Sequence, residues 1–488
     1  IGPLLNSDNA ELQAVAAEAA GLWKIEALRG KLVGLARSAA TKPGARSAAL
    51  GAIANLGGAQ SRKLLRELSG KPQTPSVRMA ATVALARVDL KEAATRAVDV
   101  LAELTPADKP EGLFAAFLSQ KQGAVILAKA VTGRKIPADI AKIGLRQASA
   151  SGRKQNLLTA ALRTAGGITT GPRKLSDEEM QQMIAGVRER GNPVRGEEIF
   201  RREDVACLKC HAIAGAGGKV GPDLVSIGGS AQIDYLIDSL LVPNKKVKEN
   251  YNTLVIVTDK GKVHTGVKIR ESARELVLRD AEDNEVVILR SSIDERADGT
   301  SLMPAGLTEK LTDAELMDLV QFMSQLGKLG PFQVTRDRVV RRWRVLQATP
   351  DAIYRIRRTR HATAATDDAA FIWKPAYSTV AGLLPTTGLP ELSRNRVTPG
   401  AKGTAFVRCE LEVTTAGKSQ LLLNSTDGLT LWLNENPRAL ANVMLLDLPQ
   451  GRHRLTFAID LSVRKTGLRV QLEDVEGSAA VVRAVSGK

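Results

Sequence analysis

The run Cys207-Leu208-Lys209-Cys210-His211 constrains this chain more than any other sequence feature. A C-x-x-C-H run attaches c-type haem: two thiols add to the vinyl groups, and the histidine ligates the iron. The two intervening residues let one turn of backbone reach both vinyl carbons, and the adjacent imidazole then points at the metal. The run uses two of only three cysteines and one of only four histidines. We therefore expect one covalent haem c, held by Cys207, Cys210 and His211.

The same run has three alternative interpretations: a chance C-x-x-C, a redox dithiol and half of a zinc site. A zinc ribbon needs a second cysteine pair, and only Cys409 remains in the chain. Neighbours of Cys409 alternate between apolar and polar, which predicts a buried thiol.

Length and charge bound the remaining possibilities. A chain of 488 residues predicts about three or four domains. Its 69 Lys and Arg against 52 Asp and Glu give a net charge of +17, which suits an acidic protein, an anionic polysaccharide or a nucleic acid. The basic residues are dispersed and aromatics make up only 3% of the chain, so we expect no nucleic-acid partner and a solvated basic surface.

No apolar run approaches the roughly 20 residues that span a bilayer, so we expect no membrane span. The chain opens at Ile1-Gly2-Pro3 without a secretory signal. Covalent haem attachment normally takes place outside the cytoplasm, which predicts a periplasmic or otherwise exported protein. The absence of a signal and the expected export are compatible if this is a processed chain or a segment of a longer protein. What precedes Ile1 stays open.

Residues 1–165 are rich in Ala and Leu and helical in period. The segment from Arg46 to Leu56 realigns with that from Arg78 to Val88, 32 residues further on, and a weaker copy runs from Gln13 to Trp23. A helical-pair period near this length predicts a solenoid, and the segment resembles HEAT-type repeats. Such stacks scaffold or bind proteins; a plain helical packing domain is the alternative.

Two further units are expected. Residues 176–330 begin with a helix capped by Ser176 and Glu179 and end at a short linker around Gly330-Pro331. Thr312 and Glu315 give a second N-cap signal, which opens the last helix of this unit. Residues 335–488 switch toward period two, which predicts an all-β sandwich. The predicted fold class is multidomain: an all-α repeat domain, a mainly α cytochrome c domain with a small inserted β-unit, and a C-terminal all-β sandwich.

The second unit resembles class I cytochromes c. In that family the first and last helices cross with a glycine against an aromatic, and Gly196 and Phe322 resemble this pair. The segment Gly221-Pro222-Asp223-Leu224 is similar to the family's loop below the haem. The resemblance implies that the carbonyl of Pro222 accepts a hydrogen bond from the ring of His211, which would orient that ligand.

The sixth iron ligand has two candidates. Ser301-Leu302-Met303-Pro304 precedes the expected last helix and resembles the methionine-ligand loop of class I cytochromes, so Met303 is the expected distal ligand. His264 is the rival. Thioether ligation raises the potential, whereas bis-histidine ligation lowers it. Lys262-Val263-His264-Thr265 alternates like an exposed strand, which argues against His264.

Residues 247–300 are strand-like and lengthen the unit beyond a minimal cytochrome, so we expect a small β-insert beside the haem. With this insert, the segment from Gly196 to Leu326 resembles the Planctomycetes–Verrucomicrobia type of haem-binding C-x-x-C-H protein. Longer relatives often carry a sugar-dehydrogenase-like propeller, which this chain lacks.

The last unit has a resemblance of its own. Asn424 to Asn434 is similar to a hairpin of galactose-binding-like and PA14-like β-sandwiches, folds that often bind carbohydrate. Trp432, Asp427 and Asn434 would then contact a sugar. The alternative is that Asp427 and Asn434 make turns and Trp432 packs in the core.

Together these features predict an exported c-type cytochrome that transfers single electrons to and from a redox partner protein. Family analogy sets it between a sugar or alcohol dehydrogenase and a respiratory acceptor. Whether the chain is also an enzyme is open, with electron transfer favoured. One alternative is a peroxidase-like haem enzyme with an open distal site. Another is a scaffold in which haem is structural or senses a gas, with carbohydrate bound at the C-terminal domain.

Overall fold

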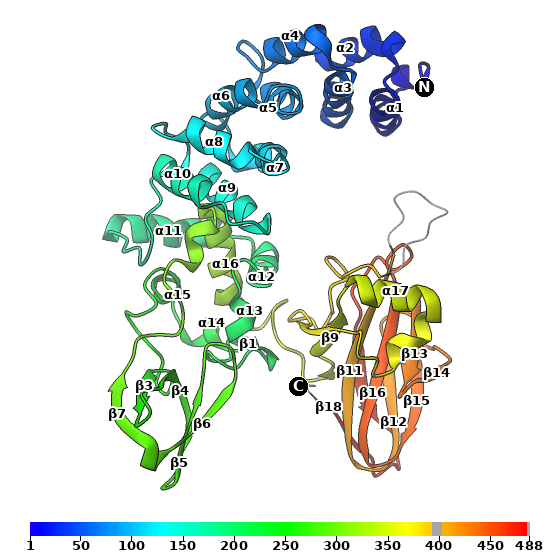
Figure 1. The fold of residues 1–488 in the computed structure, drawn as a ribbon. Coiled ribbons are helices and arrows are strands. Elements are labelled where there is room, and N and C mark those ends of the chain that lie inside the picture. The colour runs from blue at the N-terminus through cyan, green and yellow to red at the C-terminus, as the bar shows by residue number, and fades with distance from the viewer. Residues whose placement is uncertain (393–402, 486–488) are drawn as a thin grey trace.

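The structure is a computed structural model and describes residues 1–392 and 403–485. Figure 1 shows three regions in chain order: an arc of helices, a central unit of helices with a small sheet, and a β-rich region. The predicted multidomain plan, with helical repeats first and sheets last, is confirmed. Of the predicted third unit, residues 393–402 and 486–488 lie outside the described residues.

The N-terminal array is built in two layers. Helices α1, α3, α5, α7 and α9 contact one another in succession, and α6, α8 and α10 follow beside them. The helices are α1 (Ala10–Leu22), α2 (Arg29–Arg37), α3 (Pro43–Leu56), α4 (Gly58–Leu68), α5 (Pro75–Leu85), α6 (Leu90–Leu101), α7 (Glu111–Leu118), α8 (Gly123–Val131), α9 (Ala138–Ala150) and α10 (Asn156–Gly166). The two copies seen in the sequence are α3 and α5, so each repeat is one helical pair.

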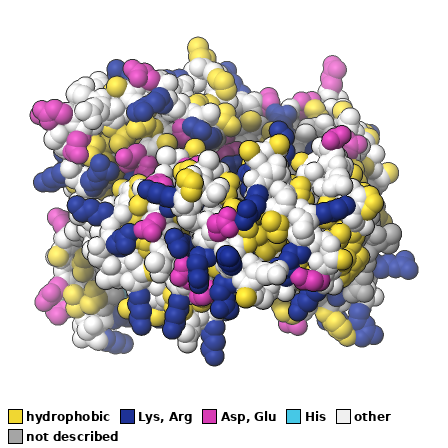
Figure 2. Space-filling view, turned by 90° about the horizontal axis from the view of Figure 1, so that it is seen from above, with side chains coloured by type: hydrophobic (Ala, Val, Ile, Leu, Met, Phe, Trp, Pro, Cys, Tyr) yellow, Lys and Arg dark blue, Asp and Glu magenta, His cyan; other side chains and the backbone are white. Residues whose placement is uncertain are grey.

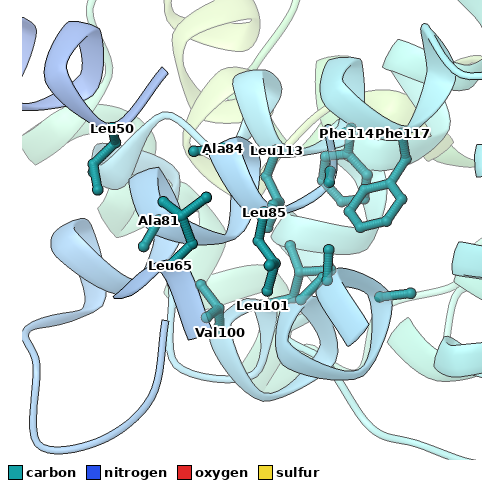
Figure 3. Packing of buried hydrophobic residues seen from close by; sticks show 14 of the residues in the cluster. Leu50, Leu65, Ala81, Ala84, Leu85, Val100, Leu101, Leu113, Phe114 and Phe117 are labelled. Atoms are coloured by element: carbon teal, nitrogen blue, oxygen red, sulfur yellow. The ribbon is translucent and has the colours of Figure 1, made fainter. Parts of the chain in front are cut away.

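Small side chains let the array pack closely. A Cβ on Gly21 of α1 would lie 2.5 Å from the Cα of Ala52 on α3, so the two backbones nearly touch. Between the layers, larger side chains fill the core: Figure 3 shows Leu65, Leu85 and Leu101 from successive helices pointing into one apolar cluster. Because each repeat buries its apolar face only against its neighbours, the array forms one continuous core.

The central unit, residues 176–330, is organised around its last helix. Helices α11, α12, α14 and α15 all contact α16. Its elements are α11 (Asp177–Arg190), α12 (Pro193–Phe200), α13 (Cys207–Cys210), β1 (Ala212–Ile213), β2 (Ala216–Gly217), α14 (Ile227–Ser230), α15 (Ile233–Leu241), η5 (Leu307–Lys310) and α16 (Asp313–Gln325). Both helix starts expected from the sequence carry a capping box, at Ser176 with Glu179 and at Thr312 with Glu315.

A separate antiparallel sheet interrupts this unit between α15 and α16. Its strands are β3 (Thr253–Thr258), β4 (Val263–Glu271), β5 (Glu275–Arg279), β6 (Glu285–Leu289) and β7 (Ile293–Asp298), in the spatial order β6-β5-β4-β3-β7. A small core of its own, centred on Ile256 and Leu276, holds the sheet together. The strands therefore lie where the alternating pattern of residues 247–300 predicts them.

The C-terminal region is a sandwich of two sheets. The larger sheet has the order β10-β9-β11-β16-β13-β14 with β18 beside β11, and the smaller has the order β15-β12-β17-β8. Side chains from both sheets share one apolar core, which includes Val407, Leu421 and Leu472. The strands are β8 (Arg338–Val339), β9 (Arg342–Leu346), β10 (Trp373–Tyr377), β11 (Thr404–Thr415), β12 (Gly417–Leu423), β13 (Leu429–Leu433), β14 (Asn436–Arg438), β15 (Val443–Leu448), β16 (Gly451–Asp460), β17 (Val470–Asp474) and β18 (Val481–Val485).

The outer face of the larger sheet is partly covered by a helix that the sequence analysis did not predict. Helix α17 (Pro350–Thr359) and the turn η6 (His361–Ala365) pack there against a second apolar cluster that includes Phe406 and Trp432. Cys409 faces the other way, into the core between the sheets, where it is 4% exposed, as predicted.

Charge is spread rather than concentrated on the face seen in Figure 2. Lys and Arg side chains lie there among Asp and Glu, with small apolar patches between them. Among the residues that the structure describes, no helix is both long and apolar enough to cross a bilayer.

Candidate functional site

The C-x-x-C-H run folds as a single helical turn against the core of the central unit. Helix α13 spans the two cysteines, and the N–H of His211 donates to the carbonyl of Cys207 at 2.8 Å. Cys207 packs against the apolar cluster that α16 completes. Both thiols are free and half-buried. One turn of backbone thus presents two sulfur atoms and an imidazole together.

The ring of His211 is held by the segment that follows the turn. Its Nδ1 lies 2.9 Å from the carbonyl oxygen of Pro222, which accepts the hydrogen bond, so Nε2 is left to act as a ligand. A Cβ on Gly221 would lie 2.4 Å from Cε1 of this ring. Burial lowers the pKa of His211, which favours the neutral imidazole that metal binding requires. The hydrogen bond is the one that the resemblance implies.

Asp223 ties this segment together, a role that the sequence analysis missed. Its carboxylate accepts from the N–H groups of Ala214 at 3.0 Å, Gly215 at 2.8 Å and Val225 at 2.9 Å. Short acidic side chains commonly hold turns in this way. The position of Asp223 directly after Gly221-Pro222 was the sequence signal that could have indicated this role.

Two glycines let the same segment wrap closely around the helical turn. A Cβ on Gly217 would lie 2.1 Å from the carbonyl oxygen of His211, and one on Gly218 would lie 1.9 Å from that of Lys209. Gly217 also has a φ of 147°, which disfavours other residues. These close approaches hold the backbone of the run against the segment that follows it.

Met303 lies against the same apolar cluster as Cys207. Its N–H donates to the hydroxyl of Ser301 at 3.1 Å, and the N–H of Ser301 in turn donates to the side-chain oxygen of Asn244 at 2.9 Å. Asn244, in the segment after α15, therefore positions the loop that carries Met303.

His264 is placed differently. It is half-buried on β4 of the inserted sheet, where it pairs across strands with Ile256. Ile256 belongs to the separate core of that sheet. Cys207 and Met303 therefore pack against the same apolar core, whereas His264 lies on a sheet that has a separate core.

The first and last helices of the unit cross in direct contact. A Cβ on Gly196 of α12 would lie 2.0 Å from the carbonyl oxygen of Asp318 and 2.6 Å from Cβ of Phe322 on α16. The ring of Phe322 lies between Phe200 and Phe332, with centroids 5.8 and 5.4 Å away. This is the glycine-against-aromatic crossing that the sequence resemblance implies.

The state of the thiols bears on the other origins of the run. Burial raises the pKa of Cys207 to about 12 and also raises that of Cys210. Redox dithiols work through a lowered thiol pKa, so these surroundings do not favour such a role. Among the described residues, no group of three or more His, Cys, Asp or Glu side chains is arranged to hold a metal ion, as a zinc ribbon would require.

The β-sandwich is joined to the central unit beside this site. Arg201 of α12 donates to the carbonyls of Tyr377 at 3.1 Å and Ser378 at 2.7 Å, and it pairs with Glu197 at 3.0 Å. Glu197 also accepts from the N–H of Val380 at 2.7 Å. We call these contacts the Arg201 joint.

A second contact reaches the loop after the helical turn. Arg342 of β9 donates to the carbonyls of Gly215 at 2.9 Å and Gly217 at 3.0 Å. Figure 1 accordingly shows β9 on the side of the sandwich that faces β1.

The N-terminal array meets the opposite end of the unit through ion pairs on α16. Lys142 pairs with Asp313 at 2.8 Å, and Arg146 pairs with Glu315 at 2.8 Å. Glu315 also pairs with Arg202, just ahead of the C-x-x-C-H run. The array and the site are therefore linked through one carboxylate.

The sugar-binding candidates of the sandwich have structural roles. Trp432 is 5% exposed beneath the helical cover, so its indole does not present a stacking surface. Asn434 has a φ of 52° in a turn and hydrogen-bonds His453 at 2.9 Å, and the hydroxyl of Ser425 donates to Asp427. The alternative prediction for these residues, turns and core packing, is confirmed.

Comparison with known proteins covers the first part of the chain. Residues 1–86 match the family described as HEAT repeats. A search of curated proteins found no match. The match shows HEAT repeats at the N-terminus of this chain, and the two-layer helical packing continues from there through α10.

Proposed function

We propose that this protein is an electron carrier with one covalent haem c in its central unit. The single observation that carries the proposal is the arrangement of the Cys207–His211 turn: two free thiols and an imidazole whose Nδ1 is engaged by Pro222. In this proposal Cys207 and Cys210 hold the porphyrin and His211 is the proximal ligand. When bound, haem supplies a ferrous–ferric couple that takes up and releases one electron.

The residues present suit such a group. Protonated, half-buried thiols on one turn are the partners that thioether attachment needs, and the neutral imidazole offers a free Nε2. The glycines at 217, 218 and 221 keep side chains away from the turn and its histidine. These features support haem attachment over a dithiol or a zinc site.

Met303 is proposed as the distal ligand because its loop lies against the core that Cys207 also contacts. The hydrogen bonds through Ser301 and Asn244 would hold its backbone in place. Ligation on both faces would leave no open position for a substrate, so the chain's residues would serve transfer of electrons rather than catalysis. Attachment outside the cytoplasm and the family resemblance support an exported carrier.

Attachment is tested by expressing the chain in a periplasm that matures c-type cytochromes. Haem should stay with the protein after denaturing electrophoresis and should be lost in the Cys207→Ala, Cys210→Ala double variant. Cys409→Ala, the matched control in the sandwich core, should keep it. Colourless wild-type protein, or equal staining of the double variant, would refute the proposal.

The distal ligand is tested by optical spectra of Met303→Ala and His264→Ala. The ferric wild type should show a weak far-red band of thioether ligation that only Met303→Ala removes. Carbon monoxide should bind reduced Met303→Ala but not the reduced wild type. Ready binding to the wild type would instead favour an open, enzyme-like site.

A further inference from the structure

The outer face of the larger sheet carries a groove beside the helix that covers it. Its lining comes from β9, β10 and β11 and includes the outward-facing residues Arg342, Arg344, Pro375, Tyr377, Arg408 and Glu410, whereas the side chains of Trp343 and Cys409 belong to the core on the other face. The register sets Arg344 directly opposite Arg408, and Arg454 of β16 directly opposite Glu410. Arg344, Arg408 and Arg454 therefore share one face of the sheet, where side chains of alternate residues project.

Arg408 is enclosed without enough partners. Its side chain is 12% exposed, and its guanidinium lies 4.2 Å from the ring centroid of Trp373. Nε and Nη1 are buried without a hydrogen bond, and the nearest carboxylate, that of Asp367, is 3.6 Å from Nη1. Buried donors are normally satisfied, so two open ones on one guanidinium indicate a missing acceptor.

Arg344 adds a second unmatched charge. Within the part of the chain that the structure describes, its side chain makes no hydrogen bond or ion pair. Like charges directly across two strands destabilise a sheet. The pKa of Arg408 reflects this, since burial and the neighbouring Arg454 and Arg344 lower it to about 10. The arrangement gains stability when an anion lies between the two guanidinium groups.

We propose that this groove binds a small oxyanion, a carboxylate or sulfate group, between Arg344 and Arg408. Guanidinium groups match such oxygens with paired hydrogen bonds. Asp367 already places a carboxylate near Arg408 and forms an ion pair of 2.7 Å with Arg454, which shows the kind of group the face accepts. The carboxylate of Glu410 in the lining repels an anion, but the arginines on this face outnumber it, so the net charge of the face stays positive. The site does not depend on haem.

Binding is measured by calorimetry on the full chain with sodium sulfate and sodium glucuronate, each against sodium chloride at equal ionic strength. At least one of the two probes should bind saturably, and which one binds tells sulfate from carboxylate recognition. Arg344→Gln should weaken that binding at least tenfold. Lys418→Gln, which removes an equal charge from an exposed site on the other sheet, should leave it unchanged.

Arg408→Gln removes the buried guanidinium and should also weaken binding. If this variant does not fold, Arg344→Gln alone decides the test. Asp367→Asn removes the competing carboxylate and should tighten binding. Saturable binding by neither probe, binding unaltered in Arg344→Gln, or weaker binding in Asp367→Asn would overturn the proposal.

Discussion

At the scale of single residues, the carbonyl of Pro222 decides how His211 can be used. The 2.9 Å hydrogen bond fixes which ring nitrogen is free, and Gly221 makes room for the ring beside it. A hydrogen bond of this kind both orients a ligand and raises its basicity. Gly221 and Pro222 therefore together fix the orientation of the His211 ring and leave its Nε2 free.

Gly221→Ala tests this arrangement. Its Cβ would overlap the imidazole at 2.4 Å, so the ring must move away from Pro222. We expect the free energy of unfolding to fall by about 1–3 kcal/mol, as for other overpacked sites, and the haem-loaded fraction to fall with it. Urea unfolding measures the first effect. Gly229→Ala, whose nearest contact would be 3.6 Å away, should lower neither.

The thiol of Cys207 gives a second residue-scale prediction. With a pKa of about 12, its thiolate fraction at pH 8 is roughly three orders of magnitude below that of an ordinary thiol. In the folded chain without haem, iodoacetamide should therefore modify Cys207 at least about tenfold more slowly than in guanidinium, because the greater nucleophilicity of a more basic thiolate offsets only part of the loss. Mass spectrometry of the labelled peptides gives both rates, and equal rates would contradict the burial of this thiol.

At the scale of elements, the sequence predicts helix starts and repeats that depend only on neighbouring residues. Ser176 with Glu179 and Thr312 with Glu315 mark helix starts because cap residues satisfy their own backbone groups, and no distant contact is needed. The two repeat copies predicted α3 and α5 for a similar reason, because each repeat packs against the repeat that follows it in the chain.

Elements that depend on distant partners were not predictable. Helix α17 was missed because what stabilises it is the far side of a sheet formed by β11, β13 and β16. The same cover buries Trp432, which its hairpin alone could not indicate. Asp223 and Asn244 were missed as site residues because their roles lie in which backbone N–H groups they reach.

The crossing of α12 and α16 carries an element-scale prediction. Gly196→Ala places a methyl group 2.0 Å from a backbone oxygen of α16, so the helices must separate. Unfolding free energy should fall by about 1–3 kcal/mol in chemical denaturation. The control has the opposite sign: Gly112→Ala on α7 meets nothing within 4 Å and should stabilise by about 0.4–1 kcal/mol. Similar losses in both variants would contradict close packing at the crossing.

At the scale of the whole molecule, the central unit is joined to its neighbours by different means. Its link to the N-terminal helical array uses ion pairs such as Lys142 with Asp313, in which the Asp313 side chain is about half exposed. Salt screens such pairs. The Arg201 joint to the sandwich is more enclosed, because the side chains of Arg201 and Glu197 are 14% and 13% exposed.

Arg201→Ala should therefore loosen the sandwich. It leaves the Glu197 carboxylate without its cation and the carbonyls of Tyr377 and Ser378 without a donor, at a cost of about 3 kcal/mol. Limited proteolysis should cut the linker between α16 and β8, residues 326–337, faster than in the wild type. Arg188→Ala, an exposed site on α11, should be cut at the wild-type rate. Unchanged cleavage in Arg201→Ala would show that other contacts hold the sandwich.

The helix crossing also sets an order of events during synthesis. Gly196 and the Cys207–His211 turn leave the ribosome well before Phe322, which must arrive to complete the core around them. Until then the cysteines belong to an open chain and keep the reactivity of ordinary thiols. If haem is attached as proposed, maturation enzymes would act before α16 docks, and a chain that folds first would bury its thiols before they react.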